Sequence, residues 1–255
     1  MQVLWNLLVC GQWNLTDGVD RIPEAASSQV KVLTEACALR VERRDSGVQV
    51  QAEVQGKQQS FRARAAILAI PGQLVPTVCP GLPEDTCGLL SGTQYSRIAN
   101  AAVALSMPPK VPYAGYAFTE DVVPGAEIEM EHLRAPNRCP EGTGMAAVFL
   151  WDTPQLRRLD AGDESLKQQA SDVVEQNFPE CRGKVLFVHL VRWNIGIAQF
   201  PPGRLRQMTA LRRQLAAWNS PFDLCGDYLD GLSSEGALRT GEEAADRIAM
   251  KLKTH

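Results

Sequence analysis

Apolar and polar residues alternate through much of the first seventy positions of the chain, which predicts a group of β-strands. Residues 30–34 are expected to form a strand, and residues 38–42 and 48–54 have the period of two that suits half-buried strands. The turn Arg44-Asp-Ser-Gly47 joins the latter two into a hairpin. Between Phe61 and Pro71 the pattern changes from alternating to continuously apolar. We therefore expect one strand there that enters a sheet covered on both faces.

The rest of the chain combines helical and strand patterns. Residues 165–178 and 205–218 carry apolar side chains at helical spacing. Ile98 to Leu105 fits a buried strand or a short helix, and the prolines that follow favour the strand. Further strands are expected at 127–131, 145–151 and 184–193. The fold class that follows is a mixed α/β arrangement, and the proline-rich texture from Gln73 onward marks a first domain boundary.

Composition narrows the class of protein without naming a function. The chain of 255 residues is 45% hydrophobic and 22% charged with a net charge of -3, so it lacks the basic surface that nucleic-acid partners require. No stretch reaches the roughly 18 apolar residues of a spanning helix. The apolar start, Met1 to Cys10, has no basic residues, so we expect neither a signal peptide nor a transmembrane segment, and a cytoplasmic protein.

Cysteine and histidine spacing gives no support for a metal site. The seven cysteines form no CxxC pair, and we expect them to be reduced thiols packed as small apolar residues. Glu127, Glu129, Glu131 and His132 allow two interpretations, a metal site or a solvated strand face, and we favour the solvated face.

The stretch from Leu224 to Ile248 has the composition of a ligand-binding loop. Gly226 and Asp227 open a turn rich in Gly, Ser and Asp, and a helix follows with glycines among its first residues. Small residues let the main chain approach a ligand, a carboxylate accepts hydrogen bonds from hydroxyls, and a helix N-terminus offers free N–H groups. A turn and a helix start without any ligand is the alternative, and Thr240-Gly-Glu-Glu243 could instead cap a helix that begins later.

Four segments in this order resemble the FAD-dependent amine oxidase superfamily, especially its protoporphyrinogen oxidase and desaturase branches. The resemblance covers nearly the whole chain. It implies an FAD-binding domain formed by residues 1–72 and 205–255, with a mixed-sheet substrate-binding domain, 73–204, inserted between them. The segments are Gly18 to Ala25, Val30 to Pro71, Val191 to Gly203, and Gly226 to Ala245.

The resemblance also assigns roles to individual residues. Gly226 and Asp227 would contact the ribityl chain or the pyrophosphate of FAD, and the backbone of Ala38 would meet the adenine. Ser233 is also assigned to cofactor binding, and the main chain around Ser234, Glu235, Gly236 and Ala237 would face the pyrimidine side of the flavin. Gly236 and Gly241 would let the helix pack closely.

The expected substrate pocket departs from that of true amine oxidases. Asn100 stands where those enzymes often have a lysine, and Ser233 replaces an aromatic residue that cages their substrate. Trp193 would line the pocket in the family pattern, but its place after a continuous apolar strand favours a core position. Asn100 could be a buried amide with its hydrogen bonds satisfied. An apolar or ring-containing substrate is expected rather than a simple amine, and no catalytic residue is assigned.

One part of the family pattern is missing from this sequence. In the family, a unit made of a strand, a GxGxxG turn and a helix binds the pyrophosphate. This sequence contains no such unit, so the FAD site is expected to be incomplete. A second polypeptide carrying GxGxxG, a fragment of a longer enzyme, or loss of flavin binding would each explain this. We expect the C-terminal part of an FAD-dependent oxidoreductase that needs a partner; the alternative is a flavin-free relic acting as a binding or assembly protein.

Overall fold

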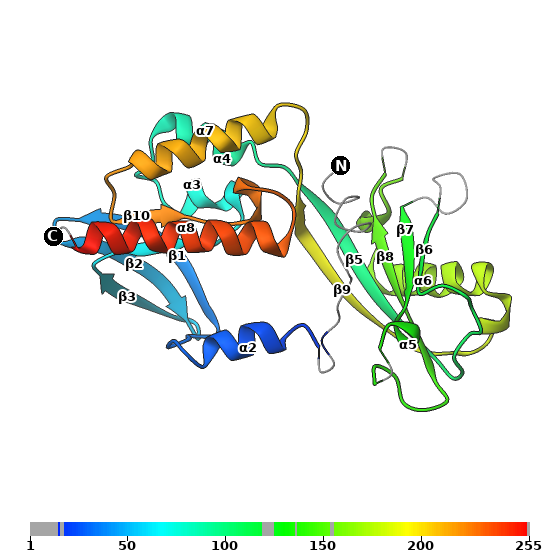
Figure 1. Ribbon diagram of the computed structural model, residues 1–255. Coiled ribbons are helices and arrows are strands. Elements are labelled where there is room, and N and C mark those ends of the chain that lie inside the picture. The colour runs from blue at the N-terminus through cyan, green and yellow to red at the C-terminus, as the bar shows by residue number, and fades with distance from the viewer. Residues whose placement is uncertain (1–14, 16–17, 119–124, 136, 154–155, 254–255) are drawn as a thin grey trace. The chain divides into compact units, whose positions relative to one another are not determined.

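The computed structural model describes residues 15, 18–118, 125–135, 137–153 and 156–253. They form two compact units, each with its own hydrophobic core. The first unit comprises the described residues of 1–32 and 97–193, including the short helix α2 (Arg21–Ser27), and the second comprises those of 33–96 and 194–255. The mixed α/β class expected from the sequence is confirmed (Figure 1).

The second unit begins with an antiparallel three-stranded sheet in which β1 (Ala36–Arg44), β2 (Gly47–Val54) and β3 (Lys57–Ala63) are neighbours. The predicted hairpin is confirmed, with Arg44 opposite Gly47 at the turn. Gly47 has a φ of +144°, and a Cβ there would lie 2.2 Å from the Ala63 carbonyl oxygen. Only glycine fits this turn, because it packs directly on the backbone of β3.

Two strand predictions in this region are wrong. The chain from Phe61 to Pro71 is divided between two sheets, because β3 ends at Ala63 and β4 (Ala66–Leu68) pairs in parallel with β10 (Phe222–Leu224). The change from alternating to continuously apolar residues marks this transfer. Residues 30–34 form no strand, and Val30 and Val32 are exposed, because no neighbouring strand pairs with them among the described residues.

Helices cover the parallel strand pair and complete the second core. They are α3 (Val75–Val78), α4 (Glu84–Ser91), α7 (Arg204–Ala217) and α8 (Ser234–Lys253), with a 3-10 turn, η1 (Gly72–Leu74), before α3. Val75, Leu90 and Met208 are fully buried in the same cluster as Leu224. The compact units divide at 32/33, 96/97 and 193/194. The FAD-binding domain expected at 1–72 and 205–255 and the substrate-binding domain expected at 73–204 stay a prediction.

The first unit is built on a five-stranded sheet whose order is β6-β7-β8-β5-β9. The strands predicted at 98–105, 127–131, 145–151 and 184–193 are confirmed, and every second residue is buried in β7 and in β5 from Ala99 to Leu105. Leu166, Ala170 and Val174 of α6 (Asp163–Asn177) pack on that buried face. The strands are β5 (Tyr95–Leu105), β6 (Gly115–Ala117), β7 (Ala126–Met130), β8 (Gly144–Trp151) and β9 (Val185–Ala198), and the short helix α5 (Glu131–Arg134) follows β7.

Short 3-10 turns complete the described elements. η2 (Arg158–Asp160) precedes α6, η3 (Pro179–Cys181) follows it, and η4 (Asp227–Leu229) joins β10 to the loop before α8. β5 and β9 each extend from one unit into the other, so the two units are connected through two adjacent strands of one sheet as well as by the chain before β1.

Candidate functional site

The loop from Gly226 to Ser234 lies at the carboxyl end of the parallel strands β4 and β10, within the second unit. Gly226 has a φ of +151°, and a Cβ there would lie 2.6 Å from the ring of Tyr228. A Cβ on Gly236 would lie 2.7 Å from the Gly231 carbonyl oxygen. Both positions require glycine, so the small residues of this motif fix the course of the loop.

Helix α8 begins at Ser234, as the family pattern implies, and the later start at Thr240 is wrong. Ser233, directly before the helix, accepts two hydrogen bonds from the first turn of α8. Its Oγ accepts from the Gly236 N–H at 3.1 Å, and its carbonyl oxygen accepts from the Ala237 N–H at 3.1 Å. The N–H groups of Ser234 and Glu235 have no acceptor among the described residues and are exposed. They are the donors that an anionic or polar ligand would find at this positive helix end.

Thr240 holds the first two turns of α8 against the loop. Its side chain is 1% exposed, and its hydroxyl lies 3.0 Å from the Gly226 nitrogen and 3.1 Å from the Gly226 oxygen. The expectation that Gly236 permits close packing of the helix agrees with these contacts. The same expectation for Gly241 is wrong, because a Cβ there would meet nothing within 4 Å.

Asp227 is the carboxylate that the motif places in the loop. Its Oδ1 accepts a hydrogen bond from the Tyr228 N–H at 2.8 Å, and its carbonyl accepts from the Gly231 N–H at 2.9 Å. Its other carboxylate oxygen has no partner among the described residues, and the side chain is half-buried. Asp227 therefore combines a fixed orientation with one oxygen available to a hydroxyl group.

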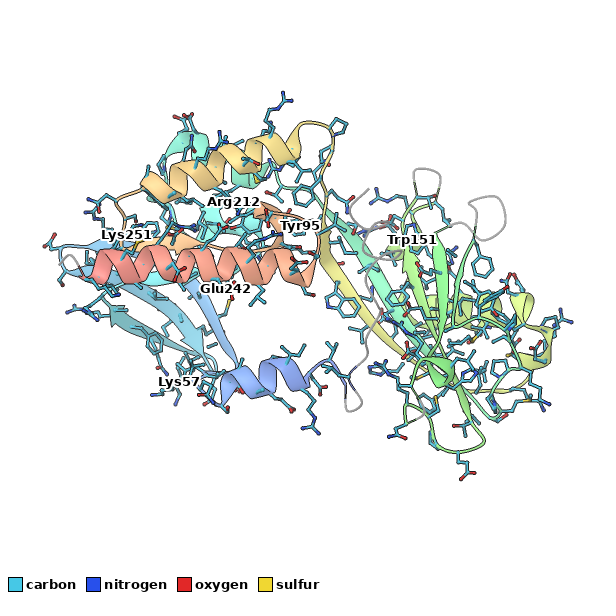
Figure 2. All side chains as sticks on the ribbon, viewed as in Figure 1. Lys57, Tyr95, Trp151, Arg212, Glu242 and Lys251 are labelled. Atoms are coloured by element: carbon cyan, nitrogen blue, oxygen red, sulfur yellow. The ribbon has the colours of Figure 1, made fainter. Side chains whose placement is uncertain are left out.

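Tyr95 and Tyr228 lie close to this carboxylate. Tyr95 lies at the start of β5 (Figure 2). Its hydroxyl accepts a hydrogen bond from the Gly72 N–H at 2.8 Å. Burial, together with the charge of Asp227, raises the pKa of Tyr95 despite that bond. Burial likewise raises the pKa of Tyr228, whose hydroxyl has no hydrogen-bond partner in the described part of the chain. Both phenols are therefore neutral under ordinary conditions.

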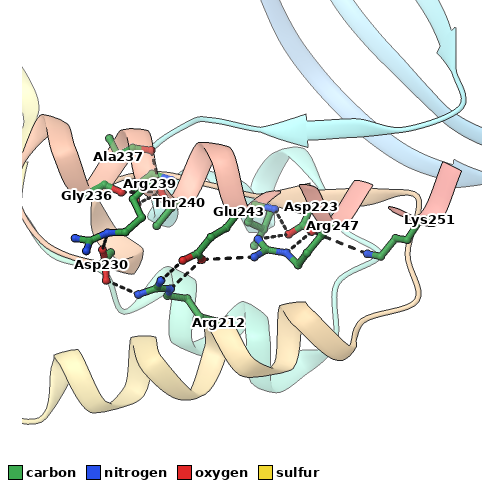
Figure 3. A network of polar contacts seen from close by, with 12 residues as sticks. Arg212, Asp223, Asp230, Gly236, Ala237, Arg239, Thr240, Glu243, Arg247 and Lys251 are labelled. Atoms are coloured by element: carbon green, nitrogen blue, oxygen red, sulfur yellow. Dashed lines mark hydrogen bonds and ion pairs between the residues drawn. The ribbon is translucent and has the colours of Figure 1, made fainter. Parts of the chain in front are cut away.

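A fully buried carboxylate lies in the strand that leads into the loop (Figure 3). Asp223, in the middle of β10, is 0% exposed. Its carboxylate accepts hydrogen bonds from Arg247, from Nε at 2.8 Å and from Nη2 at 3.1 Å. The Leu224 N–H also donates to it at 2.8 Å. A buried charge is tolerated only with such partners, so Arg247 anchors the C-terminal half of α8 to β10.

Arg212 of α7 extends this network to the loop. It contacts Asp230, immediately after η4, and Glu243 of α8, whose Oε2 lies 3.6 Å from Arg247 (Figure 3). Arg239 also pairs with Asp230, at 2.6 Å. Sequence reasoning missed this network. The only local signal was the four-residue spacing of Glu243 and Arg247, because Arg212 and Asp230 come together only through packing of α7 on η4.

The predicted adenine contact lies in the same unit. Ala38 is exposed on β1 at a register shift between Ala38 and Arg40. Among the described strands β1 has a single neighbour, β2, so the other edge of β1 is open at Ala38. The predicted contact of this backbone with adenine stays a prediction.

The predicted pocket residues lie in the first unit, on the sheet face opposite α6. Asn100 of β5 is opposite Phe149, which is opposite Glu127, and all three are half-buried. The Asn100 amide has no hydrogen-bond partner among the described residues, so it is not a satisfied buried amide. Trp193 on the adjacent strand β9 is 45% exposed, which excludes the core position.

Arginine side chains form ion pairs with glutamates in β7 and directly after it. Arg134 contacts Glu129 and also lies 3.5 Å from Glu131, and Arg138 contacts Glu131. Glu131 is 5% exposed and begins α5, so the solvated strand face is wrong for this residue. Burial raises the pKa of Glu129, against the lowering effect of Arg134. No group of three or more His, Cys, Asp or Glu side chains suited to a metal occurs in the described ranges.

No nucleotide fingerprint accompanies the C-terminal motif. The run Gly142-Thr-Gly-Met-Ala-Ala147 has a related glycine spacing, but it leads into the strand β8 and not into a helix. It therefore lacks the helix N-terminus that binds a pyrophosphate. None of the helices in the described residues is both long and apolar enough to span a membrane.

Solved structures share this fold at low sequence identity. A candidate protoporphyrinogen oxidase from Exiguobacterium sp. 255-15 aligns over 94% of this chain with 16% identity and a TM-score of 0.72. Cyclohexylamine oxidase from Brevibacterium oxydans aligns over 92% with 19% identity and a TM-score of 0.71. These alignments cover 52% and 53% of those two proteins, so the chain spans about half their length. Reduced UDP-galactopyranose mutase aligns over 88% of the chain and 48% of its own length, with 12% identity and a TM-score of 0.68.

Family membership rests on the sequence as a whole. A search of curated proteins found no match. The family described as flavin containing amine oxidoreductase matches residues 5–249, which includes the strands of both units and the C-terminal motif. The chain belongs to the flavin-containing amine oxidoreductase family.

Proposed function

We propose that this chain is the C-terminal part of an FAD-dependent oxidoreductase and that its loop Gly226–Ala237 binds FAD. The observation that carries the proposal is the group of unused polar atoms at this loop: the N–H groups of Ser234 and Glu235 and one oxygen of Asp227. They lie where Gly226 and Gly236 bring the main chain close together. This donor set fits a cofactor that carries both hydroxyl groups and an electron-accepting ring.

FAD, when bound, supplies the capacity to accept a hydride from a substrate carbon. The residues of this chain would hold and orient it. Asp227 would accept a hydrogen bond from a ribityl hydroxyl, and the N–H groups at the start of α8 would favour negative charge next to them. The contacts of Arg212 and Arg239 with Asp230 would keep the loop in place.

The half-buried sheet face of the first unit is our candidate for the substrate wall. Asn100, Phe149 and Trp193 offer aromatic surface and one uncompensated amide, which suits an apolar or ring-containing substrate with a polar group. We assign no acid–base pair to the described residues of this face. The proposed chemistry therefore depends on positioning and exclusion of water.

We further propose that the pyrophosphate is bound by a GxGxxG unit on a partner polypeptide. Three observations support this: the sequence contains no such unit, the chain matches about half of its solved relatives, and β4 has only β10 as a strand neighbour in the described structure. A parallel strand added beside β4 would extend the two-stranded sheet. Ile67, in the middle of β4, is 39% exposed.

The test is to purify the chain alone and together with the proteins encoded beside it, and to measure flavin by visible absorbance before and after denaturation. We expect flavin only in preparations that contain a GxGxxG-bearing partner. Absence of flavin from every preparation would overturn the proposal, and a stable, flavin-free chain that binds a small apolar molecule or a protein would support the role of binding or assembly protein.

A matched pair of variants locates the cofactor on the loop. Gly236→Ala introduces a methyl group 2.7 Å from the Gly231 carbonyl oxygen, whereas Gly241→Ala makes the same change about 1.4 turns later, where nothing lies within 4 Å. In preparations that contain the GxGxxG-bearing partner, we expect flavin to be lost from Gly236→Ala and retained by Gly241→Ala. Equal flavin content in the two variants, with both folded by circular dichroism, would place the cofactor elsewhere.

A further inference from the structure

A cavity of about 440 Å³ lies at the end of the parallel strands opposite the candidate flavin site. Arg64 and Ala65 precede β4 and Pro221 precedes β10, and all three line the cavity. Gly226, in contrast, follows β10. The cavity therefore belongs to the amino ends of the two strands and is separate from the Gly226–Ala237 loop.

The wall of this cavity is held in place by a glycine contact. Gly47, in the turn between β1 and β2, has a φ of +144°, and a Cβ there would lie 2.2 Å from the Ala63 oxygen and 3.0 Å from the Arg64 Cα. The turn therefore packs against the backbone at Arg64. This contact brings the end of β1, with Arg43, next to the start of the link into β4, although the two arginines are 21 positions apart.

The cavity concentrates positive charge in a chain whose net charge is -3. Its lining contains four cationic side chains and one carboxylate: Arg43, Arg44, Arg64, Lys251 and Asp45. Arg44 is paired with Glu42 at 2.7 Å, and the Lys251 amine lies 3.3 Å from the Ser220 oxygen (Figure 2 labels Lys251). Arg43 and Arg64 have no carboxylate partner among the described residues.

Two unpaired guanidinium groups at one cavity match the charge of a phosphate dianion. Guanidinium is planar and binds phosphate oxygens with two parallel N–H donors, and it remains charged at every physiological pH. Asn219 and Ser220 add polar groups to the same lining. Apolar side chains of Pro221, Ile248 and Leu252 also line the cavity. A ligand that fits this lining has an anionic head and an apolar body.

We propose that this cavity binds a small organic phosphate monoester through Arg43 and Arg64. The phosphate group contacts the two guanidinium groups, and the apolar part of the ester packs against Ile248 and Leu252. The site does not depend on the flavin, because no residue of the Gly226–Ala237 loop lines the cavity. It would allow a phosphorylated metabolite to bind this protein away from the proposed catalytic centre.

The test is calorimetric titration of the purified chain with phenyl phosphate, inorganic phosphate and benzoate. We expect saturable binding of one phenyl phosphate per chain, at least about tenfold tighter than either inorganic phosphate, which lacks the apolar body, or benzoate, which carries a single charge. Absence of saturable phenyl phosphate binding, or equal affinity for the three compounds, would overturn the proposal.

Variants assign the binding to the two arginines. Arg43→Ala and Arg64→Ala are each expected to weaken phenyl phosphate binding at least about tenfold. Arg206→Ala removes the same charge from an exposed position of α7 and is expected to change the affinity less than twofold. Equal effects of the three substitutions would mean nonspecific attraction and would contradict the proposal.

A final titration separates a soluble ester from a lipid headgroup with the same chemistry. The chain is mixed with phosphatidylcholine vesicles with and without phosphatidic acid, and bound protein is measured by sedimentation. We expect that no chain sediments with the vesicles when phenyl phosphate is present in excess. Binding to phosphatidic acid vesicles that phenyl phosphate does not reduce would overturn the assignment to a small soluble ester.

Discussion

Among single residues, Tyr228 shows how packing can take precedence over hydrogen bonding. Its ring packs directly on the backbone of two glycines. A Cβ atom on Gly72 would lie 2.9 Å from the nearest ring carbon, and one on Gly226 would lie 2.6 Å from it. Its hydroxyl is buried and has no hydrogen-bond partner in the described structure. Tyr95 is the opposite case, because its hydroxyl satisfies the Gly72 N–H. The ring of Tyr228, and not its hydroxyl, supports the turn at Gly226.

The two tyrosines allow a direct comparison by substitution with phenylalanine. Tyr228→Phe removes an uncompensated buried hydroxyl and is expected to leave stability unchanged or raise it by about 1 kcal/mol. Tyr95→Phe leaves the Gly72 N–H without its acceptor and is expected to cost about 1–3 kcal/mol. Urea denaturation followed by circular dichroism measures both. A larger loss from Tyr228→Phe than from Tyr95→Phe would contradict this account.

Asp152 in the first unit gives stability a dependence on pH. Burial by itself raises its pKa, but the Leu159 N–H at 2.9 Å and the Arg97 guanidinium outweigh burial, so the pKa is lowered. A carboxyl group with a lowered folded pKa stabilises the protein above its unfolded pKa of about 3.9, and this contribution is lost as the pH falls through the folded value.

We therefore expect Asp152→Asn to lower the free energy of unfolding by about 1.5–3 kcal/mol at pH 7. The difference from the unchanged protein should shrink as the pH falls below about 4, because Asp152 itself becomes neutral. Urea denaturation at a series of pH values measures this. Glu141→Gln, at an exposed turn, is the control and should show little difference at any pH. A difference that is independent of pH would rule out the ionic explanation.

Within elements, helix α8 depends on a stripe of small residues. Gly236, Thr240 and Ala244 are buried at intervals of four, and Ile248 continues the same face. Glycine and alanine let the helix approach the loop and β10 closely, and Thr240 adds hydrogen bonds to both polar groups of Gly226. The helix that begins the candidate site is therefore positioned by packing against that site.

Thr240→Val keeps the shape of this side chain and removes its hydroxyl. It is expected to cost about 1–3 kcal/mol, because the half-buried Gly226 N–H loses its acceptor. Thr209→Val is the matched control on α7, since the Thr209 hydroxyl bonds only the Leu205 carbonyl of its own helix and is exposed. Chemical denaturation compares the two. Equal losses would indicate that β-branching in a helix, and not the contact with Gly226, determines the effect.

At the scale of the whole molecule, the two hydrophobic cores divide the chain differently from its order in sequence. Leu150 is fully buried in the core of the first unit, and Leu211 is fully buried in that of the second. The second unit combines residues from 33–96 with residues from 194–255. Each core should therefore respond mainly to substitutions within its own unit.

Leu150→Ala and Leu211→Ala test this division, and each is expected to cost about 2–5 kcal/mol. Hydrogen exchange measured by mass spectrometry should become faster in α7, β10 and α8 for Leu211→Ala. For Leu150→Ala the faster exchange should lie in β7, β8 and α6. If either variant accelerates exchange equally in both units, the chain unfolds as one cooperative unit and the division has no energetic meaning.

The sequence by itself determined the elements whose pattern is local. The hairpin around Arg44–Gly47, the helix on Leu166 and Val174, and the Gly226–Ser234 loop before α8 all follow from periodicity and turn residues within a short window. The same motifs carried the resemblance to the flavin-containing family, which the match over residues 5–249 confirms.

Tertiary structure alone decided which distant segments meet. The transfer of the chain from β3 to β4, the pairing of β4 with β10, and the contacts of Arg212 with Asp230 and Glu243 all join positions far apart in sequence. Periodicity reports whether a side chain is buried and does not identify what covers it. For that reason the loop at Gly226 was predictable, whereas the network that holds it and the basic cavity at Arg64 were not.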